Sequence, residues 1–442
     1  MSVRLASSSL QRVQIVPPLI ERAPLAAAQD PGALAWQGEV RLAADRASGI
    51  GAARWQRQVR NGLLERAMVL GADHRRGPHG ERPEVGRRLL AHIDALAEAG
   101  LSFAEIEAFA GEAELDHPGA LWVLSILFGC LDDSTAEEAF EAWVDSLDAS
   151  LFLDYRAVEE IAEALRILPN PALRQGALRW AGGPSSVLRA VALEALSLDQ
   201  VSDDLLLRLS GDERPLVRAA LERLFARTPR DAPRREPTRG SWIDIAAPAL
   251  SYEVARARLL QRDSEPLFRL RRRESTALAA LGPHALDLLA LAGDGRDGAL
   301  AADLVRALPG TPHLLSTMGR VGFSSLLPRL LAELDNDDLE DEAHEALSTM
   351  LGPRVSRPSR GAWEQVILAL PEASRTARLR GGEAYTPASV LEEMKRPELS
   401  EQDLRLRADE VLIVTGKQAS PAWGAFGISL EGALSELFRL AR

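Results

Sequence analysis

The chain has 442 residues, of which 46% are hydrophobic and 26% charged, and its formal net charge is −12. A chain of this length buries one extended core or two to three smaller ones. The acidic balance argues against a general nucleic-acid binder, because a phosphate backbone selects for a basic surface. Aromatic residues make up only 5%, which favours closely packed helices over sheets of β-branched residues. We therefore expect an all-α protein.

Residues 1–84 differ in pattern from the rest of the chain. Helical stretches at 33–47 and 52–70 are followed by Gly71–Pro83, where glycines and prolines break any regular period. We interpret this break as a loop or linker. The first ten residues lack the apolar core of a secretory signal, and no apolar run reaches the roughly 18 residues of a membrane span. The expectation is a cytoplasmic protein without membrane contact.

From residue 85 to 228 the pattern is helix after helix. The Leu188-Arg189 pair in one amphipathic helix returns 29 positions later as Val217-Arg218 in another. This spacing fits one helical hairpin per repeat. The second helix places four apolar residues on one face: Val217, Ala220, Leu221 and Leu224. Because such hairpins bury their apolar faces against one another, we predict an α-solenoid of stacked helical hairpins.

Residues 229–240 interrupt the helices with prolines and arginines. They form either a linker between two sets of repeats or a long loop within one continuous stack. Residues 241–442 are predicted to form a second set, with helices that stop at Gly352 and Gly416. Residues 284–292 and 299–308 form a weaker copy, and residues 430–440 a final capping helix.

Two sequence motifs resemble nucleotide-binding loops. Gly293–Gly298 has the glycine spacing of a dinucleotide fingerprint, but it follows a helix, and its two aspartates would face a pyrophosphate. We interpret it as a tight turn between helices. Thr415-Gly416-Lys417 resembles the end of a phosphate loop but lacks the first glycine and the metal-binding hydroxyl. We therefore predict no cofactor-binding residues.

The sequence contains few residues whose type and spacing are typical of a metal site. His74 and His79 lie five residues apart in the predicted loop, and we interpret them as surface histidines. His92 and His344 are ordinary helix positions. The acidic run at residues 335–342 lacks the glycine and spacing of a calcium loop, and carboxylates at a helix start complement the helix dipole. The single cysteine, Cys130, excludes an intramolecular disulfide. We predict no metal site and no catalytic residue.

Two groups of residues are candidates for binding a partner. Trp36 and Trp55 lie in the less regular N-terminal part, where they could anchor another protein. Arg271, Arg272 and Arg273 form the densest basic patch, with salt bridges or a solvated helix face as the alternative. Five other tryptophans mostly have apolar neighbours and are predicted to lie in the core: Trp122, Trp143, Trp180, Trp242 and Trp363.

The Leu188-Arg189 and Val217-Arg218 helices resemble HEAT repeats of the type named after phycobiliprotein lyases. Three stretches further resemble a bacterial HEAT-like family found among type VI secretion genes: residues 87–100, 343–352 and 407–416. The resemblance spans about residues 12–417. It departs at Ile93-Asp94-Ala95, which lacks a glycine, and at His344, which replaces one. It implies an accessory protein of a secretion apparatus and carries over no catalytic residue.

We therefore expect a non-enzymatic protein-binding scaffold, adaptor or chaperone, in a type VI secretion context. Its partners are expected to be proteins, among them components or effectors of the apparatus, and not nucleic acid or membrane. The alternative is a HEAT-like enzyme, either a chromophore lyase or a DNA glycosylase. The acidic charge weakens the glycosylase hypothesis, and Cys130, which follows the apolar run of residues 121–129, offers a lyase no exposed thiol.

Overall fold

The computed structural model describes most of the chain from Ile50 to Gly416: residues 50–77, 82–98, 103–112, 119–129, 136–167, 170–227, 245, 247–352, 357–372, 374, 377–396 and 398–416. These residues are largely helical, and the strands among them are limited to one short hairpin. The prediction of an all-α protein is confirmed. The described residues up to Leu224, with 398–403, form one compact unit, and those of 225–396 and 404–416 form a second.

The first unit consists of consecutive short helices after one long one. Its α-helices are α2 (Ile50–Arg76), α3 (Arg82–Glu98), α4 (Phe103–Glu112), α5 (Ala120–Gly129), α6 (Ala136–Ser146), α7 (Arg156–Ile167), α8 (Pro171–Trp180), α9 (Ser186–Ala195), α10 (Asp203–Ser210) and α11 (Pro215–Arg227). Two 3-10 helices, η2 (Ala149–Leu153) and η3 (Leu198–Gln200), lie in its connections. Asn170, Ser185 and Ser202 each cap a helix by accepting hydrogen bonds from its first turn.

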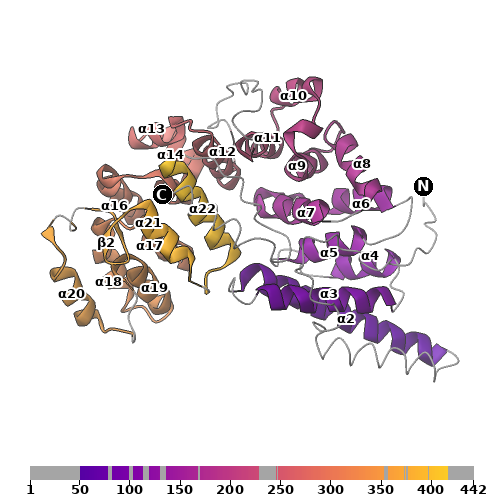
Figure 1. Cartoon of the computed structure of the whole chain (residues 1–442), viewed down its shortest axis with the longest axis horizontal. Helices are drawn as coiled ribbons and strands as arrows, with labels where there is room; N and C mark the ends of the chain where they lie inside the picture. The colour runs from indigo at the N-terminus through magenta and orange to yellow at the C-terminus, as the bar shows by residue number, and fades with distance from the viewer. Residues whose placement is uncertain are drawn as a thin grey trace. The chain divides into compact units, whose positions relative to one another are not determined.

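Helices of the first unit pack in two rows. Within one row α2 contacts α5, α5 contacts α7, and α7 contacts α9; in the other, α6 contacts α8. Figure 1 shows α5, α7 and α9 one above another, with α4, α6 and α8 beside them. α5 lies at the centre, and all ten of its residues are buried, as expected for a helix that is apolar on every face.

The repeat helices bury the faces that the sequence predicts. In α11 the four predicted apolar residues are all buried, and Leu188 of α9 is 2% exposed. Four of the tryptophans predicted to lie in the core are buried: Trp122, Trp143, Trp180 and Trp363. Trp242, residues 33–47, 229–240 and 430–440, Cys130 and His79 lie outside the described residues.

The second unit contains shorter helices and the hairpin. Its α-helices are α12 (Pro248–Leu260), α13 (Glu265–Arg271), α14 (Ser275–Leu281), α15 (Ala285–Ala292), α16 (Gly298–Arg306), α17 (Pro312–Val321), α18 (Leu327–Glu333), α19 (Glu340–Leu351), α20 (Arg360–Leu368), α21 (Pro387–Met394) and most of α22 (Glu401–Thr415). The 3-10 helices are η5 (Gly282–His284), η6 (Gly295–Asp297) and η7 (Ser324–Leu326).

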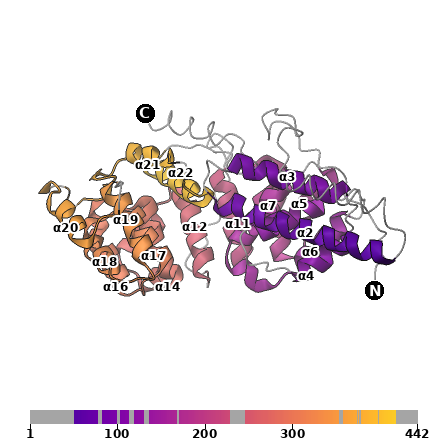
Figure 2. The same cartoon turned by 90° about the horizontal axis from the view of Figure 1, so that it is seen from below.

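One row of helices runs through this second unit as well. α12 contacts α15, α15 contacts α17, and α17 contacts α19, with α13, α14, α16 and α18 against them. Figure 2 shows α17 and α19 side by side. The predicted stops at Gly352 and Gly416 are confirmed, since their φ angles are +95° and +60°. The acidic run begins α19, as predicted, with Glu340, Asp341 and Glu342 in its first turn.

The hairpin was not predicted from the sequence. β1 (Leu379–Arg380) pairs antiparallel with β2 (Glu383–Ala384), and Leu379 donates its backbone N–H to the carbonyl of Gly322 over 2.7 Å. Gly322 has a φ of +72°, and a Cβ there would lie 2.3 Å from the Leu379 oxygen. The hairpin is thereby held against the end of α17.

The predicted loop at Gly71–Pro83 is wrong over its first half, because α2 continues to Arg76. A Cβ at Gly71 would lie 2.3 Å from Val123. Gly71 therefore allows close approach of α2 to α5 and does not end the helix. His74, predicted on the surface, is fully buried and stacks on Trp122 with ring centroids 5.0 Å apart.

One stretch, Ser275–Ala292, is long and apolar enough to span a membrane, contrary to the expectation that none would be. A single stretch of this kind is weak evidence for a membrane span, because more than half of the stretch is buried and the core helices of soluble proteins pass the same test. The structure divides it among α14, η5 and α15, with a φ of +50° at Gly282.

Candidate functional site

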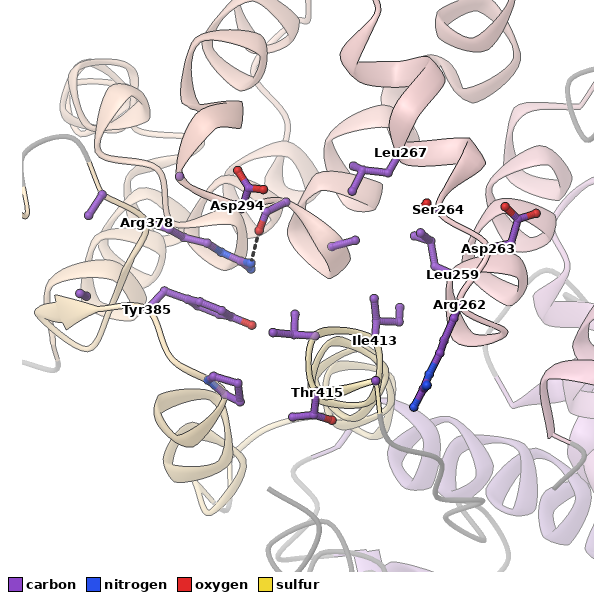
Figure 3. Close-up of a pocket in the computed structure, with 18 residues that line it drawn as sticks. Leu259, Arg262, Asp263, Ser264, Leu267, Asp294, Arg378, Tyr385, Ile413 and Thr415 are labelled. Carbon is purple, nitrogen blue, oxygen red and sulfur yellow. Dashed lines mark hydrogen bonds between the residues drawn. The ribbon is translucent and has the colours of Figure 1, made fainter. Parts of the chain in front are cut away.

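A pocket of about 890 Å³ lies within the second unit. Four segments that are far apart in the sequence meet around it: the end of α12, the turn after α15, the hairpin region, and the end of α22. Its walls are largely apolar, with Leu259, Leu267, Ala292, Ile413 and Val414 among the lining residues. Figure 3 shows Tyr385 and Arg262 on opposite sides of this pocket.

Buried Arg378 holds one side of the pocket together. Its guanidinium donates to the carbonyls of Ala290 over 2.6 Å and Gly293 over 3.0 Å, at the end of α15. It also donates to the carbonyl of Val321 over 2.8 Å, at the end of α17. Carbonyls at helix ends have no partner within the helix. Arg378 therefore satisfies two helix ends at once and fixes the position of the hairpin beside them.

Glu410 of α22 balances the charge of this arginine. It pairs with Arg378 and, over 3.1 Å, with Arg380, and all three side chains are 3% exposed or less. Arg380 lies 3.0 Å from Glu393 of α21, so the ion pairs tie β1 to α21 and α22. Buried charges are tolerated only when they are paired in this way.

Tyr385 provides a polar group on the same side. Its backbone N–H donates to the Arg378 carbonyl over 2.8 Å, and the Arg378 guanidinium lies 3.8 Å from the centre of its ring. Burial, together with the nearby Glu410 carboxylate, raises the pKa of Tyr385 above its usual value. The hydroxyl therefore stays protonated at neutral pH, and Figure 3 shows it directed into the pocket.

Arg262 faces the pocket from the opposite side. It follows the end of α12 with a φ of +67°, and its guanidinium would lie 3.4 Å from a Cβ placed at Gly416. This side chain is exposed. Within the described part of the chain, the structure gives the Arg262 guanidinium neither a hydrogen bond nor an ion pair.

The two acidic residues at the pocket are held by other arginines. Asp294 binds Arg271 over 2.9 Å and Arg296 over 2.8 Å. The hydrogen bond from Arg296 holds the pKa of Asp294 well below its usual range. Asp263 lies 3.7 Å from Arg258. Neither carboxylate neutralises Arg262, so the pocket combines apolar walls with one available cation. That combination suits a ligand with a carboxylate next to an apolar group.

The structure explains the candidate basic patch by local contacts. Arg271 binds Asp294 and Asp297, the latter over 2.7 Å, and Arg273 binds Asp303 over 2.5 Å. Arg272 lies over the ring of Phe268. Salt bridges were the alternative interpretation of this patch, and they fit Arg271 and Arg273. Trp36 and the side chain of Trp55 lie outside the described residues.

The two rejected nucleotide motifs both border the pocket. Gly293–Gly298 is a tight inter-helix turn, as predicted: η6 lies within it, and Asp294 and Asp297 bond to each other's backbone N–H groups. Thr415 and Gly416 lie at the end of α22, and Lys417 is outside the described residues. Arg262, Arg378 and Tyr385 were missed by the sequence analysis, because no periodic pattern connects them.

Comparison of the chain with protein-family models, with curated proteins and with solved structures finds no match in any of the three. The resemblance to HEAT-like repeats and to the family found among type VI secretion genes therefore stays a prediction.

Proposed function

We propose that this chain is a non-enzymatic protein-binding scaffold, an adaptor or chaperone, whose second unit holds an acidic, apolar segment of a partner protein. Arg262 carries the proposal. It is a cation without a partner among the described residues, beside walls that include Leu259, Ile413 and Val414. A guanidinium binds a carboxylate through charge-assisted hydrogen bonds, and an apolar side chain next to that carboxylate would cover the walls.

The helix rows support the same proposal. In each unit, alternate helices of the chain pack against one another in a row: α5, α7 and α9 in the first unit, and α15, α17 and α19 in the second. The proposed α-solenoid of stacked HEAT-like hairpins would use such faces to hold a partner over a long surface. Binding energy in such interfaces concentrates in a few well-packed positions, and the pocket provides one.

The finer proposal places the partner in a type VI secretion apparatus, in the cytoplasm. Its support is the resemblance of residues 87–100, 343–352 and 407–416 to the family found among those genes. The structure adds that Arg407 and Glu410, in the last of these stretches, hold the pocket through ion pairs to α21 and β1. The resemblance and the pocket thus involve the same helix.

The test is purification of the tagged protein from its own cells after mild crosslinking, followed by mass spectrometry. Spike, sheath or effector proteins recovered with it are the expected result. Recovery of other partners, together with normal secretion by cells lacking the protein, would remove the secretion context. Recovery of the protein alone would contradict the scaffold itself. A coloured preparation would favour a chromophore lyase, and retention on DNA a glycosylase.

A further inference from the structure

A second cluster of chemistry-bearing side chains lies in the second unit, at α15 and α17. Asp287 is 3% exposed, and its Oδ2 accepts hydrogen bonds from His284 Nδ1 and His313 Nε2, each over 3.1 Å. Because a carboxylate only accepts, both imidazoles donate here. The three ligand atoms lie within 4.8 Å of one another.

We propose that His284, Asp287 and His313 bind a divalent transition-metal ion, with zinc as the best-suited ion. Two imidazole nitrogens and one carboxylate oxygen form a donor set that zinc favours. On metal binding the proton of each imidazole would lie on the ring nitrogen that faces away from Asp287, Nε2 of His284 and Nδ1 of His313, so that the nitrogen facing the carboxylate offers its lone pair to the ion. Closing the set around the ion requires only a small movement, because both nitrogens already lie within hydrogen-bond distance of that oxygen.

The surroundings prepare the carboxylate for this role. Its other oxygen, Oδ1, accepts from Thr317 over 2.8 Å and from Arg320 over 2.6 Å. Outer contacts of this kind orient a metal-binding carboxylate and leave its second oxygen for the ion. Burial opposes ionisation of Asp287, but the hydrogen bonds from His284 and His313 and the charge of Arg320 hold its pKa well below the usual range. The carboxylate is therefore charged.

The two histidines differ in ways that suit a binding site with an open position. The His284 ring stacks on Tyr252, with centroids 5.3 Å apart, and this contact restrains the plane of the imidazole. The His313 side chain is 60% exposed and can move to complete the site. This exposure also leaves room for water at the fourth position of a tetrahedral ion.

The spacing of the histidines shows how the cluster arises. His284 and His313 are 29 residues apart, the same interval that separates Leu188 from Val217 in the first unit. They precede α15 and lie in α17, two helices that contact each other. Because α15 and α17 pack side by side, a histidine at the start of each helix brings two imidazoles to the carboxylate of Asp287.

The test is titration of the metal-free full chain with zinc chloride at about pH 8, because protons compete with the metal for its ligands and a lower pH would weaken binding. Calorimetry gives the stoichiometry and the dissociation constant. We expect one zinc ion per chain in this site, and at least about tenfold weaker binding in His313→Gln and in His284→Gln. Glutamine keeps a donor for Asp287, and His313 is exposed, so the first variant folds. His79→Gln is the matched control and should bind as the wild type does.

Cobalt substitution gives a second measurement, because a cluster that serves packing alone would not produce the absorption of a bound cobalt ion. The cobalt complex of the wild type should show the visible absorption of tetrahedral coordination, and His313→Gln should lose it. No zinc binding by the wild type, or equal binding by the wild type and both histidine variants, would overturn the proposal. Either result would leave a histidine–aspartate–arginine cluster that serves packing alone.

Discussion

Arg378 donates a hydrogen bond of 3.0 Å to the carbonyl of Gly293, a residue 85 positions earlier in the chain (Figure 3). This bond joins the hairpin region to the end of α15 and closes one side of the pocket. The opposite side carries Arg262, whose charge has no partner among the described residues. Among the described residues at the pocket, Arg378 is paired and holds one side in place, whereas Arg262 is available to bind a ligand.

Gly322→Ala should destabilise the second unit. The φ of Gly322 is +72°, and a Cβ there would lie 2.3 Å from the Leu379 oxygen. The left-handed conformation alone costs an alanine about 1–2 kcal/mol, and the clash adds to it. Gly361→Ala, in α20 with no atom within 4 Å of the added Cβ, should be neutral or stabilise by up to about 1 kcal/mol. Urea unfolding measures both, and equal effects would contradict the hairpin contact.

Leu221→Asp should strongly destabilise the first unit. Leu221 is 7% exposed in α11, and an unpaired charge in that position costs about 3 kcal/mol or more. Leu207→Asp is the matched control, because Leu207 of α10 is 68% exposed and its replacement should change stability by less than about 0.5 kcal/mol. Thermal melting distinguishes the two. An unchanged melting temperature for Leu221→Asp would show that this helix face is not buried.

Glu393 should make stability depend on pH in the acidic range. Burial opposes its ionisation, but Arg380 and Arg407 outweigh that effect and lower the pKa of Glu393 from 4.5 to about 2. A lowered folded-state pKa contributes stability above the unfolded value and loses it as the pH falls towards the folded value. Unfolding free energy should therefore decline from about pH 4.5 to about pH 2.

Two variants isolate this contribution of Glu393. Glu393→Gln removes the titrating group and should flatten the decline, at the cost of lower stability near neutral pH. Glu392→Gln, at an exposed neighbouring position paired with Lys395, should keep the wild-type profile. Parallel pH profiles of denaturant unfolding for all three proteins decide the matter. A decline of the same steepness in Glu393→Gln would assign it to other carboxylates.

The helical character could be predicted because it depends on local periodicity. The 29-residue interval found in the sequence reappears as a contact: Arg223 of α11 donates to Glu194 of α9, 29 residues earlier, over 3.2 Å. Glycines that end helices, such as Gly352, were also predicted correctly. Local patterns of this kind do not depend on which distant segment a helix contacts.

The wrong loop prediction and the missed pocket residues both depend on contacts between segments that are far apart in the sequence. Gly71 begins a stretch rich in glycine and proline, which predicts the end of a helix. In the structure α2 continues through Gly71, and Val123 approaches so closely that only glycine fits at this position. The continued helix then buries His74 against Trp122. The pocket depends on Arg378 bonding to carbonyls of two helix ends, and carbonyls have no side-chain identity that a sequence pattern could show.

The most direct test of the binding proposal places a photo-crosslinking amino acid at Val414, which lines the pocket and is 41% exposed. The charge variant is Arg262→Asn, because asparagine tolerates the positive φ that alanine would not. The matched control is Arg273→Asn, since Arg273 also has a positive φ, of 55°, but binds Asp303 outside the pocket.

Irradiation in the protein's own cells should crosslink Val414 to a protein segment that carries a carboxylate beside apolar residues. Arg262→Asn should reduce the yield at least about tenfold, the loss expected for one charge-assisted contact, whereas Arg273→Asn should leave it unchanged. The account would be contradicted by a yield that is the same in both variants, or by a crosslinker at Val414 that captures no protein at all.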